Sequence, residues 1–190
     1  MKKLLLLFLL ISSTFVFGQK NEFNLIKLDS TWGQEVIRFP ARNINYVGVG
    51  DIRFPPKGWI NPEHTFFWSY TYAWSIDVNR KIPADELASN LEKYFNSLNR
   101  IDFNDKTNKN RATAIIKRIK KQSKTTFYEG TIATYDRFAT NKTFTLNVKI
   151  ESHYCKKAKK TIILFKFSPK EFTHKVWQTL DKIELEKGSL

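Results

Sequence analysis

Residues 64–78 read HTFFWSYTYAWSIDV, and this alternating stretch decides the fold of the chain. Large apolar side chains occupy every second position from Phe66 to Val78, and the positions between them are mostly small or polar. A repeat of two places successive side chains on opposite faces of a β-strand. We therefore predict a central strand over His64–Val78, with one aromatic face and one face small enough for another layer to approach closely.

Weaker strand patterns precede this stretch, at about Glu35–Phe39 and Tyr46–Phe54. The second of them contains Gly48 and Gly50. Glycine inside a strand indicates a bulge or a close approach by another part of the backbone.

Two helices are predicted downstream. The first begins at Pro83, where apolar residues start to recur at helical spacing and where proline suits the first helical position. The second begins at Ser168-Pro169-Lys170-Glu171, which has the form of a capping box. The predicted buried face of this second helix comprises Phe172, Val176, Leu180 and Ile183, with Trp177 alongside.

Four strands are predicted between the two helices: Ala112–Gln122, Thr126–Phe138, Phe144–Cys155 and Lys160–Phe167. The isoleucines of the first also fit a short helix, and its β-rich surroundings favour the strand. Short connections favour an antiparallel meander. The predicted class is thus α+β, an antiparallel β-sheet flanked by two helices in the order βββαββββα.

In the order of its elements the chain resembles the PsbP/Mog1 superfamily. The resemblance rests on the helix at Pro83, the meander of residues 112–167 and a terminal helix that runs to residues 182–185. It implies a PsbP/Mog1-like sandwich. Members of that superfamily serve as photosystem accessory subunits, small-GTPase regulators and exported bacterial proteins, mostly in binding or assembly. A fold by itself does not transmit a function.

The first 18 residues have the form of a secretory signal peptide, with two lysines followed by the apolar run Leu4–Ile11. This run is too short to span a membrane as a helix. We expect cleavage before Gln19 and a single α+β domain over residues 19–190. The expected product is an exported protein without a transmembrane segment, either periplasmic or secreted.

The single cysteine of the chain restricts which covalent modifications and cross-links the exported protein can have. Because Cys155 is the only cysteine, a lipid-modified cysteine at the cleavage site and an intramolecular disulfide are both excluded. The sequence predicts an exported protein that is not a lipoprotein and that depends on its core for stability.

Charge is distributed unevenly along the chain. The sequence has 32 Lys and Arg against 18 Asp and Glu, for a net charge of +14. Residues 19–99 hold 9 basic and 9 acidic residues, whereas residues 100–190 hold 21 and 9. A positive surface of this kind favours an anionic envelope component or another polyanion as the partner. The alternative explanation is that the charges only keep the protein in solution.

The predicted meander brings two lysine-rich turns together. The turn after Gln122 and the turn after Cys155 fall at the same end of an antiparallel sheet, about 10 Å apart at ~4.8 Å per strand. We predict that one patch for an anionic partner forms there, from Lys120, Lys121, Lys124, Lys156, Lys157, Lys159 and Lys160.

Two other functions remain open. One strand face carries Glu151, His153 and Cys155 at a spacing of two residues, so their side chains could meet. A cysteine thiol activated by a histidine imidazole is a nucleophile, and this arrangement predicts a hydrolase or transferase. The same face otherwise has the polar residues of a solvated surface. Trp32 and Trp59, each beside a glycine, predict either a carbohydrate-binding module that stacks on sugar rings or a cover for the ends of the core.

No motif for a catalytic triad, a metal or a cofactor occurs in the sequence. This favours a non-catalytic envelope or secreted binding or accessory protein, without metal or cofactor, over an enzyme.

Overall fold

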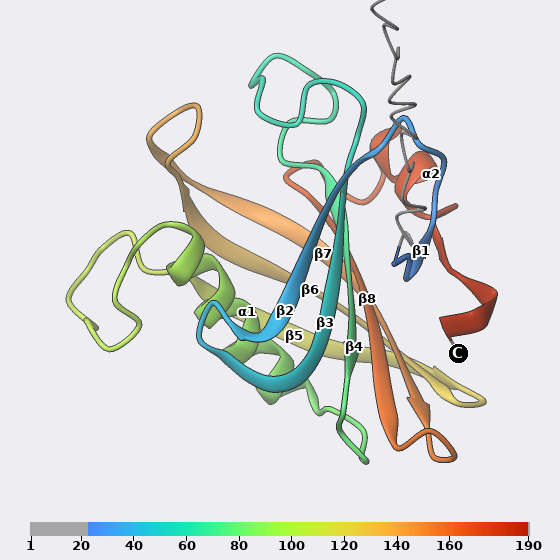
Figure 1. Ribbon diagram of the computed structural model, residues 1–190. Coiled ribbons are helices and arrows are strands. Elements are labelled where there is room, and N and C mark those ends of the chain that lie inside the picture. Colours follow the sequence, from blue (N-terminus) through green and yellow to red (C-terminus); the bar gives the residue numbers. More distant parts are fainter. Residues whose placement is uncertain (1–22, 190) are drawn as a thin grey trace, which may run out of the picture.

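The structure, a computed structural model, describes residues 23–189. The predicted signal peptide and its cleavage site before Gln19 lie outside these residues. Within them the chain forms a mixed α+β fold, in which an antiparallel sheet carries other elements on both of its faces (Figure 1).

Seven antiparallel strands form the main sheet, in the spatial order β2-β3-β4-β8-β7-β6-β5. Strands β5 to β8 make the predicted meander, and β4 joins it to the β2–β3 hairpin by pairing with both β3 and β8. The bounds are β2 (Gly33–Ala41), β3 (Ile44–Phe54), β4 (Tyr70–Ile76), β5 (Thr113–Gln122), β6 (Thr125–Asp136), β7 (Lys142–Cys155) and β8 (Lys160–Ser168).

The remaining elements lie on the faces of this sheet (Figure 1). Helix α1 (Ala84–Leu98) covers one face, where its apolar side chains join the larger core cluster. The other face carries the short helix α2 (Val176–Leu180) and a two-stranded sheet of β1 (Ile26–Lys27) and β9 (Glu184–Leu185). A 3-10 turn, η1 (Lys187–Ser189), follows β9.

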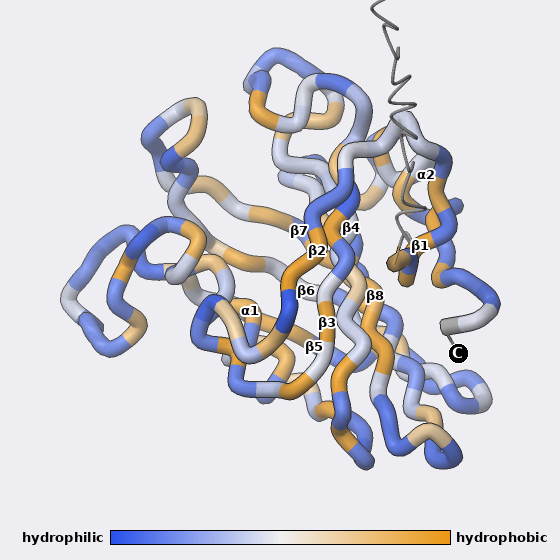
Figure 2. Tube along the Cα trace, in the orientation of Figure 1, coloured by the Kyte–Doolittle hydropathy of each residue, from blue (hydrophilic) through white to orange (hydrophobic). Residues whose placement is uncertain are grey.

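The core is continuous through the two central strands. Every residue of β4 is buried, and so is β8 from Thr161 onward, because both strands have a covering layer on each face. Figure 2 shows a concentration of hydrophobic residues along β8, whereas β4, with its tyrosine, threonine and serine residues, is mostly pale, and the outer loops are largely hydrophilic. Burial on both faces fits their position in the middle of the sheet.

Strand β4 has the two faces that its sequence predicts. Tyr70, Tyr72 and Trp74 belong to the cluster beneath α1. Ala73 on the opposite face belongs to the cluster beneath α2, where its small side chain lets the second layer approach. The close backbone approach predicted at the glycines of β3 is also present. Gly48, at a φ of 151°, lies so near the backbone of β4 that a side chain there would collide with it.

The predicted strand over His64–Val78 is too long at both ends. Residues 64–69 form turns that belong to the connection between β3 and β4, and the strand ends at Ile76. The reason lies at Trp68, whose φ of 48° breaks the extended backbone and whose amide donates to the carbonyl of Trp59 at 2.7 Å. Alternation alone does not detect such a tertiary constraint.

The predicted final helix begins too early. Ser168 ends β8, and α2 starts only at Val176, after a series of turns. The hydroxyl of Ser168 does accept from the Lys170 amide at 3.2 Å, but the Lys170 carbonyl accepts from the buried Trp177 indole at 2.9 Å. Burying this indole holds residues 169–175 in turns instead of a helix. The observed order further includes β1 and β9, which the predicted βββαββββα order lacks.

Candidate functional site

Two lysine-rich turns meet at one end of the sheet. The β5–β6 and β7–β8 connections lie at the same end because the three hairpin pairings of the meander are antiparallel. Thr125 at the start of β6 pairs with His153 near the end of β7, so the two turns are neighbours. The turns form the lower right of Figure 1.

A shallow depression of about 360 Å³ lies between the two turns. Lys124 from the first turn and Lys156 and Lys157 from the second line it. Lys81, from the connection between β4 and α1, lines the same depression, and the side chain of Lys121 lies beside it. We call these five residues, Lys81, Lys121, Lys124, Lys156 and Lys157, the basic hairpin patch.

Lys81 and Lys121 lie close enough within the basic hairpin patch to affect each other's charge. Proximity to the Lys121 side chain is the main cause that lowers the pKa of Lys81 below its ordinary value, and the positive charge of Arg118 acts in the same direction. A bound anion would relieve this repulsion. Positive charges gathered in this way attract anions.

The other predicted lysines lie apart from the patch. Lys120 is adjacent to Lys121 in β5, so its side chain points to the opposite face, where its ammonium lies 4.9 Å from the centre of the Phe127 ring. Lys160 forms an ion pair with Asp77 at 3.3 Å. Lys159 is exposed in the turn, at a φ of 52°. The structure thus gathers Lys121, Lys124, Lys156 and Lys157 from the predicted seven and adds Lys81.

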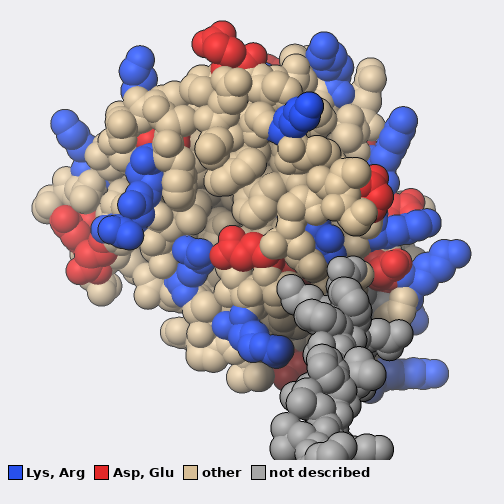
Figure 3. Space-filling model, turned by 45° about the horizontal axis from the view of Figure 1, so that its top comes forward, with Lys and Arg blue, Asp and Glu red and all other residues tan. Residues whose placement is uncertain are grey.

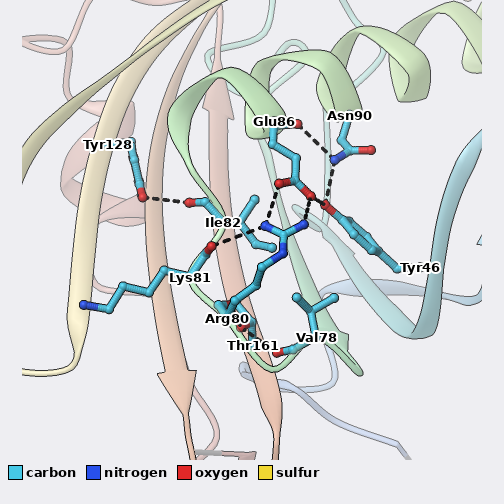
Figure 4. A network of polar contacts seen from close by, with 9 residues as sticks. All are labelled: Tyr46, Val78, Arg80, Lys81, Ile82, Glu86, Asn90, Tyr128 and Thr161. Carbon is cyan, nitrogen blue, oxygen red and sulfur yellow. Dashed lines mark hydrogen bonds and ion pairs between the residues drawn. The ribbon is translucent and has the colours of Figure 1, made fainter.

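A polar network fixes the segment that carries Lys81 (Figure 4). Arg80 donates to both oxygens of Glu86 on α1, at 2.7 and 2.8 Å, and this hydrogen bonding lowers the pKa of Glu86. The Thr161 hydroxyl in β8 donates to two carbonyls of the segment, and the Tyr128 hydroxyl in β6 donates to a third. The Lys81 side chain extends away from this network in Figure 4. Lys81 therefore has a fixed backbone and a free charged end.

Lys81 could not be found by sequence reasoning. It lies at the patch because β4 pairs with β8, so that the chain leaves β4 at the end where β8 begins. That pairing joins residues almost 100 positions apart, such as Tyr70 and Phe167. The nearby signal in the sequence is the Arg80-Lys81 pair, which by itself indicates only a polar connection.

The predicted thiol site is assembled only in part: His153 lies near Glu151 but does not bond to Cys155. His153 Nδ1 lies 2.9 Å from the Thr125 hydroxyl, and its Nε2 lies 3.9 Å from a Glu151 oxygen. Burial lowers the pKa of His153, while Glu151 acts in the opposite sense. Among the described residues no hydrogen bond joins His153 to Cys155, whose half-buried side chain lines the depression between the turns instead.

The strand face that carries Glu151 is covered instead of solvated. The Lys166 ammonium, whose side chain is only 4% exposed, donates to Glu151 at 2.8 Å. Lys149 pairs with Asp181 at 2.8 Å and lies 5.0 Å from the centre of the Trp177 ring. The segment that includes α2 therefore closes over these charges, which act as a structural network beneath it.

Trp32 and Trp59 lie on different parts of the molecule. Trp32 is half-buried against the cluster beneath α2, with its ring 6.4 Å from that of Phe66. Trp59 is also half-buried. The centre of its ring lies 4.7 Å from that of Phe54 and 6.3 Å from that of the core residue Trp68. Trp59 lines a cavity at the end of the sheet opposite the basic hairpin patch, and Trp32 is not part of its lining.

No protein-family model matches the sequence, and neither curated proteins nor solved structures match it significantly. Within residues 23–189, no helix has the length and apolar character needed to cross a membrane.

Proposed function

We propose that this chain is an exported, non-catalytic binding protein of the envelope or the extracellular space, whose basic hairpin patch binds a polyanionic partner. The observation that carries the proposal is the convergence of five lysines from three separate segments on one depression. Export is inferred from the first 18 residues. The PsbP/Mog1-like sandwich remains the proposed fold relationship and assigns no activity.

The chemistry of the patch favours a partner with several negative charges. Ammonium groups on flexible stems act as point charges, which suit phosphate-, sulfate- or carboxylate-bearing polymers better than one planar group. The lysines of the two turns are exposed, so their fields are screened within about 8 Å at physiological salt. An extended anion that contacts several lysines at once gains the most from this arrangement.

Within the described part of the chain, the lysines of the basic hairpin patch are not neutralised by nearby carboxylates. Among the described side chains, neither the four hairpin lysines nor Lys81 forms a salt bridge. Asp77, one of the two acidic residues nearest in sequence to Lys81, pairs with Lys160. The positive charge of the patch is therefore available to a partner.

Binding to heparin, a model polyanion, tests the proposal. We expect the mature protein to bind at low salt and to lose at least about tenfold in affinity as ionic strength approaches physiological values. Lys124→Glu and the Lys156→Glu/Lys157→Glu pair should each weaken binding. Their combination should be non-additive, because both clusters contact one ligand.

Lys120→Glu is the matched control. It makes the same charge change as Lys124→Glu, four residues earlier in the chain and near the same turn, but on the face of β5 that carries the Phe127 ring. We expect a clearly smaller effect than for a patch lysine. If Lys120→Glu lost as much heparin affinity as a patch variant, the overall positive charge of the protein, and not the patch, would account for binding. An absence of heparin binding at low salt would reject the proposal. Anionic lipid vesicles and lipopolysaccharide, measured in parallel, identify the class of polyanion.

A further inference from the structure

We propose a second, independent binding site for a small organic anion with a flat aromatic body. It is a cavity of about 380 Å³ at the end of the sheet opposite the basic hairpin patch. The β3–β4 connection, the last turn of α1 and the β6–β7 turn enclose it. We call it the aromatic pocket; its aromatic walls are Phe54, Trp59, Trp68, Tyr70, Tyr94 and Phe138.

The walls of the aromatic pocket are graded from buried to exposed. Trp68 and Tyr70 are 1% and 2% exposed, whereas Phe138 at the mouth is 44% exposed. Trp59 is half-buried between them, 6.1 Å from the Phe138 ring. An exposed aromatic beside a concave apolar wall leaves surface that a flat ligand would cover. The cavity volume falls in the range of small-molecule sites, about 300–1,000 Å³.

The rim of the pocket has an excess of positive charge. Three arginines and one glutamate line it: Arg42, Arg100, Arg137 and Glu35. Arg42 pairs with Glu35 at 3.3 Å, so the glutamate is already neutralised. Arg100 and Arg137 have no carboxylate partner among the described side chains. Planar guanidinium groups recognise carboxylates by paired hydrogen bonds, which a rim of lysines would do less well.

Buried donors in the wall add a second, independent observation. Trp68 Nε1 and Tyr70 Oη are buried and have no hydrogen-bond partner among the described residues. Burial chiefly raises the pKa of Tyr70, and the neighbouring Tyr94 hydroxyl acts in the same direction, so the Tyr70 hydroxyl stays protonated. Buried polar atoms without a partner are uncommon in native proteins. The described side chains have eight of them, and Trp68 and Tyr70 supply the two that belong to residues lining this pocket. A ligand oxygen at the inner end of the pocket would accept hydrogen bonds from these donors after a small adjustment of the wall.

The backbone around the pocket is held in place before any ligand binds. Asp136 accepts from the amides of Phe138, Ala139 and Thr140, at 2.8 to 3.2 Å, which fixes the turn that carries Arg137. Arg100 follows α1 at a φ of 57°, and its amide donates to the Ser97 carbonyl at 3.1 Å. Such preorganisation lowers the entropic cost of binding.

Charge at the rim distinguishes this ligand from a sugar. A neutral sugar would stack on Trp59 but would leave both guanidinium groups without an anionic partner. The shared chemistry that fits walls and rim is an aromatic or similarly flat body that carries one carboxylate. This ligand differs from the partner of the basic hairpin patch, so the two proposals stand or fall separately.

Titration with 2-naphthoate tests the site, followed by tryptophan fluorescence and calorimetry, with 2-naphthalenemethanol as the neutral analogue. We expect saturable 1:1 binding of the carboxylate and at least about tenfold weaker binding of the alcohol. Arg137→Gln and Arg100→Gln should each weaken the carboxylate about tenfold and leave the alcohol unchanged. Lys106→Gln, which removes one exposed charge without a contact to the pocket, should change neither.

Several results would overturn the site. These are equal affinity for the two naphthalenes, insensitivity to both arginine variants, tighter binding of cellobiose than of 2-naphthoate, or no binding at about 10 mM ligand. Circular dichroism checks that each variant is folded. Heparin, added before the titration, should leave naphthoate binding intact, so a failure of the basic hairpin patch is distinguished from a failure of the pocket.

Discussion

Trp74 lies at the centre of the aromatic layer beneath α1. Its ring lies 4.6 Å from that of Phe165 and 5.6 Å from those of Phe39 and Tyr72, and it is fully buried. These contacts join β2, β4 and β8 across the sheet. The single residue thus supports several elements that are distant in sequence.

We predict that Trp74→Ala lowers the free energy of unfolding by about 3–5 kcal/mol, because it leaves a large cavity that a close-packed core cannot refill. Urea unfolding followed by circular dichroism measures this loss. Ile115→Ala, at a position 63% exposed on the edge strand β5, is the control and should change stability by less than about 0.5 kcal/mol. Similar values for both variants would contradict the assignment of the core.

At the scale of the element, the β6–β7 turn is organised by one carboxylate. Asp136 is fully buried and accepts hydrogen bonds from three backbone amides and from the Thr140 hydroxyl. Burial opposes its ionisation, but these hydrogen bonds outweigh burial and lower the pKa of Asp136 below its ordinary 3.8. The turn therefore depends on the charged form of this residue.

We predict that Asp136→Asn destabilises the fold by about 1–3 kcal/mol at neutral pH, since it removes charge-assisted hydrogen bonds inside a buried turn. The folded state binds the proton less readily than the unfolded state, so the contribution of Asp136 is present above about pH 4 and is lost as the pH falls through its lowered pKa. The difference between wild type and variant should shrink over that range. Urea unfolding from pH 7 to pH 3 measures it.

Asp105→Asn is the matched control for this prediction. Asp105 accepts from the amide and hydroxyl of Thr107 in a similar local turn, but it is exposed in the segment between α1 and β5. Its replacement should have little effect on stability at any pH. A pH-independent difference between wild type and Asp136→Asn would show that shape, and not charge, holds the β6–β7 turn.

At the scale of the whole molecule, the two ends of the sheet have different chemistry. The β5–β6 and β7–β8 turns form a lysine-rich end, whereas the aromatic pocket occupies the opposite end. Figure 3 shows one face of the molecule, where Lys and Arg side chains, some of them beside Asp or Glu, are scattered over a largely uncharged surface. Two unlike ligands could therefore bind without competing.

The proposed export would determine which form of the protein meets these ligands. We predict that the mature protein begins at Gln19 after removal of residues 1–18. Intact mass spectrometry of the exported protein should match residues 19–190, or that mass with a cyclised amino-terminal glutamine. A mature form that retains Met1 would contradict export by a cleaved signal peptide.

Local patterns in the sequence were sufficient for most elements. Alternation identified the faces of β4, helical spacing identified α1, and closely spaced strands with lysine-rich turns identified the meander and its basic end. These features depend on neighbours within a few residues, which is the range over which side-chain periodicity carries information. The two neighbouring lysine turns follow from the antiparallel meander alone.

Only the tertiary structure decided the remaining features, because they depend on contacts between distant residues. Insertion of β4 between β3 and β8 placed Lys81 at the patch. Lys120 is separated from the patch by the alternation of side chains along β5, which puts its ammonium over Phe127 on the other face. Burial of Trp177 shortened the final helix, and α2 covered the charges of β7. The aromatic pocket combines Trp59, Arg100 and Arg137 from three separate connections, and no local period relates them. Periodicity determines which face of an element is buried, whereas long-range packing determines what meets it.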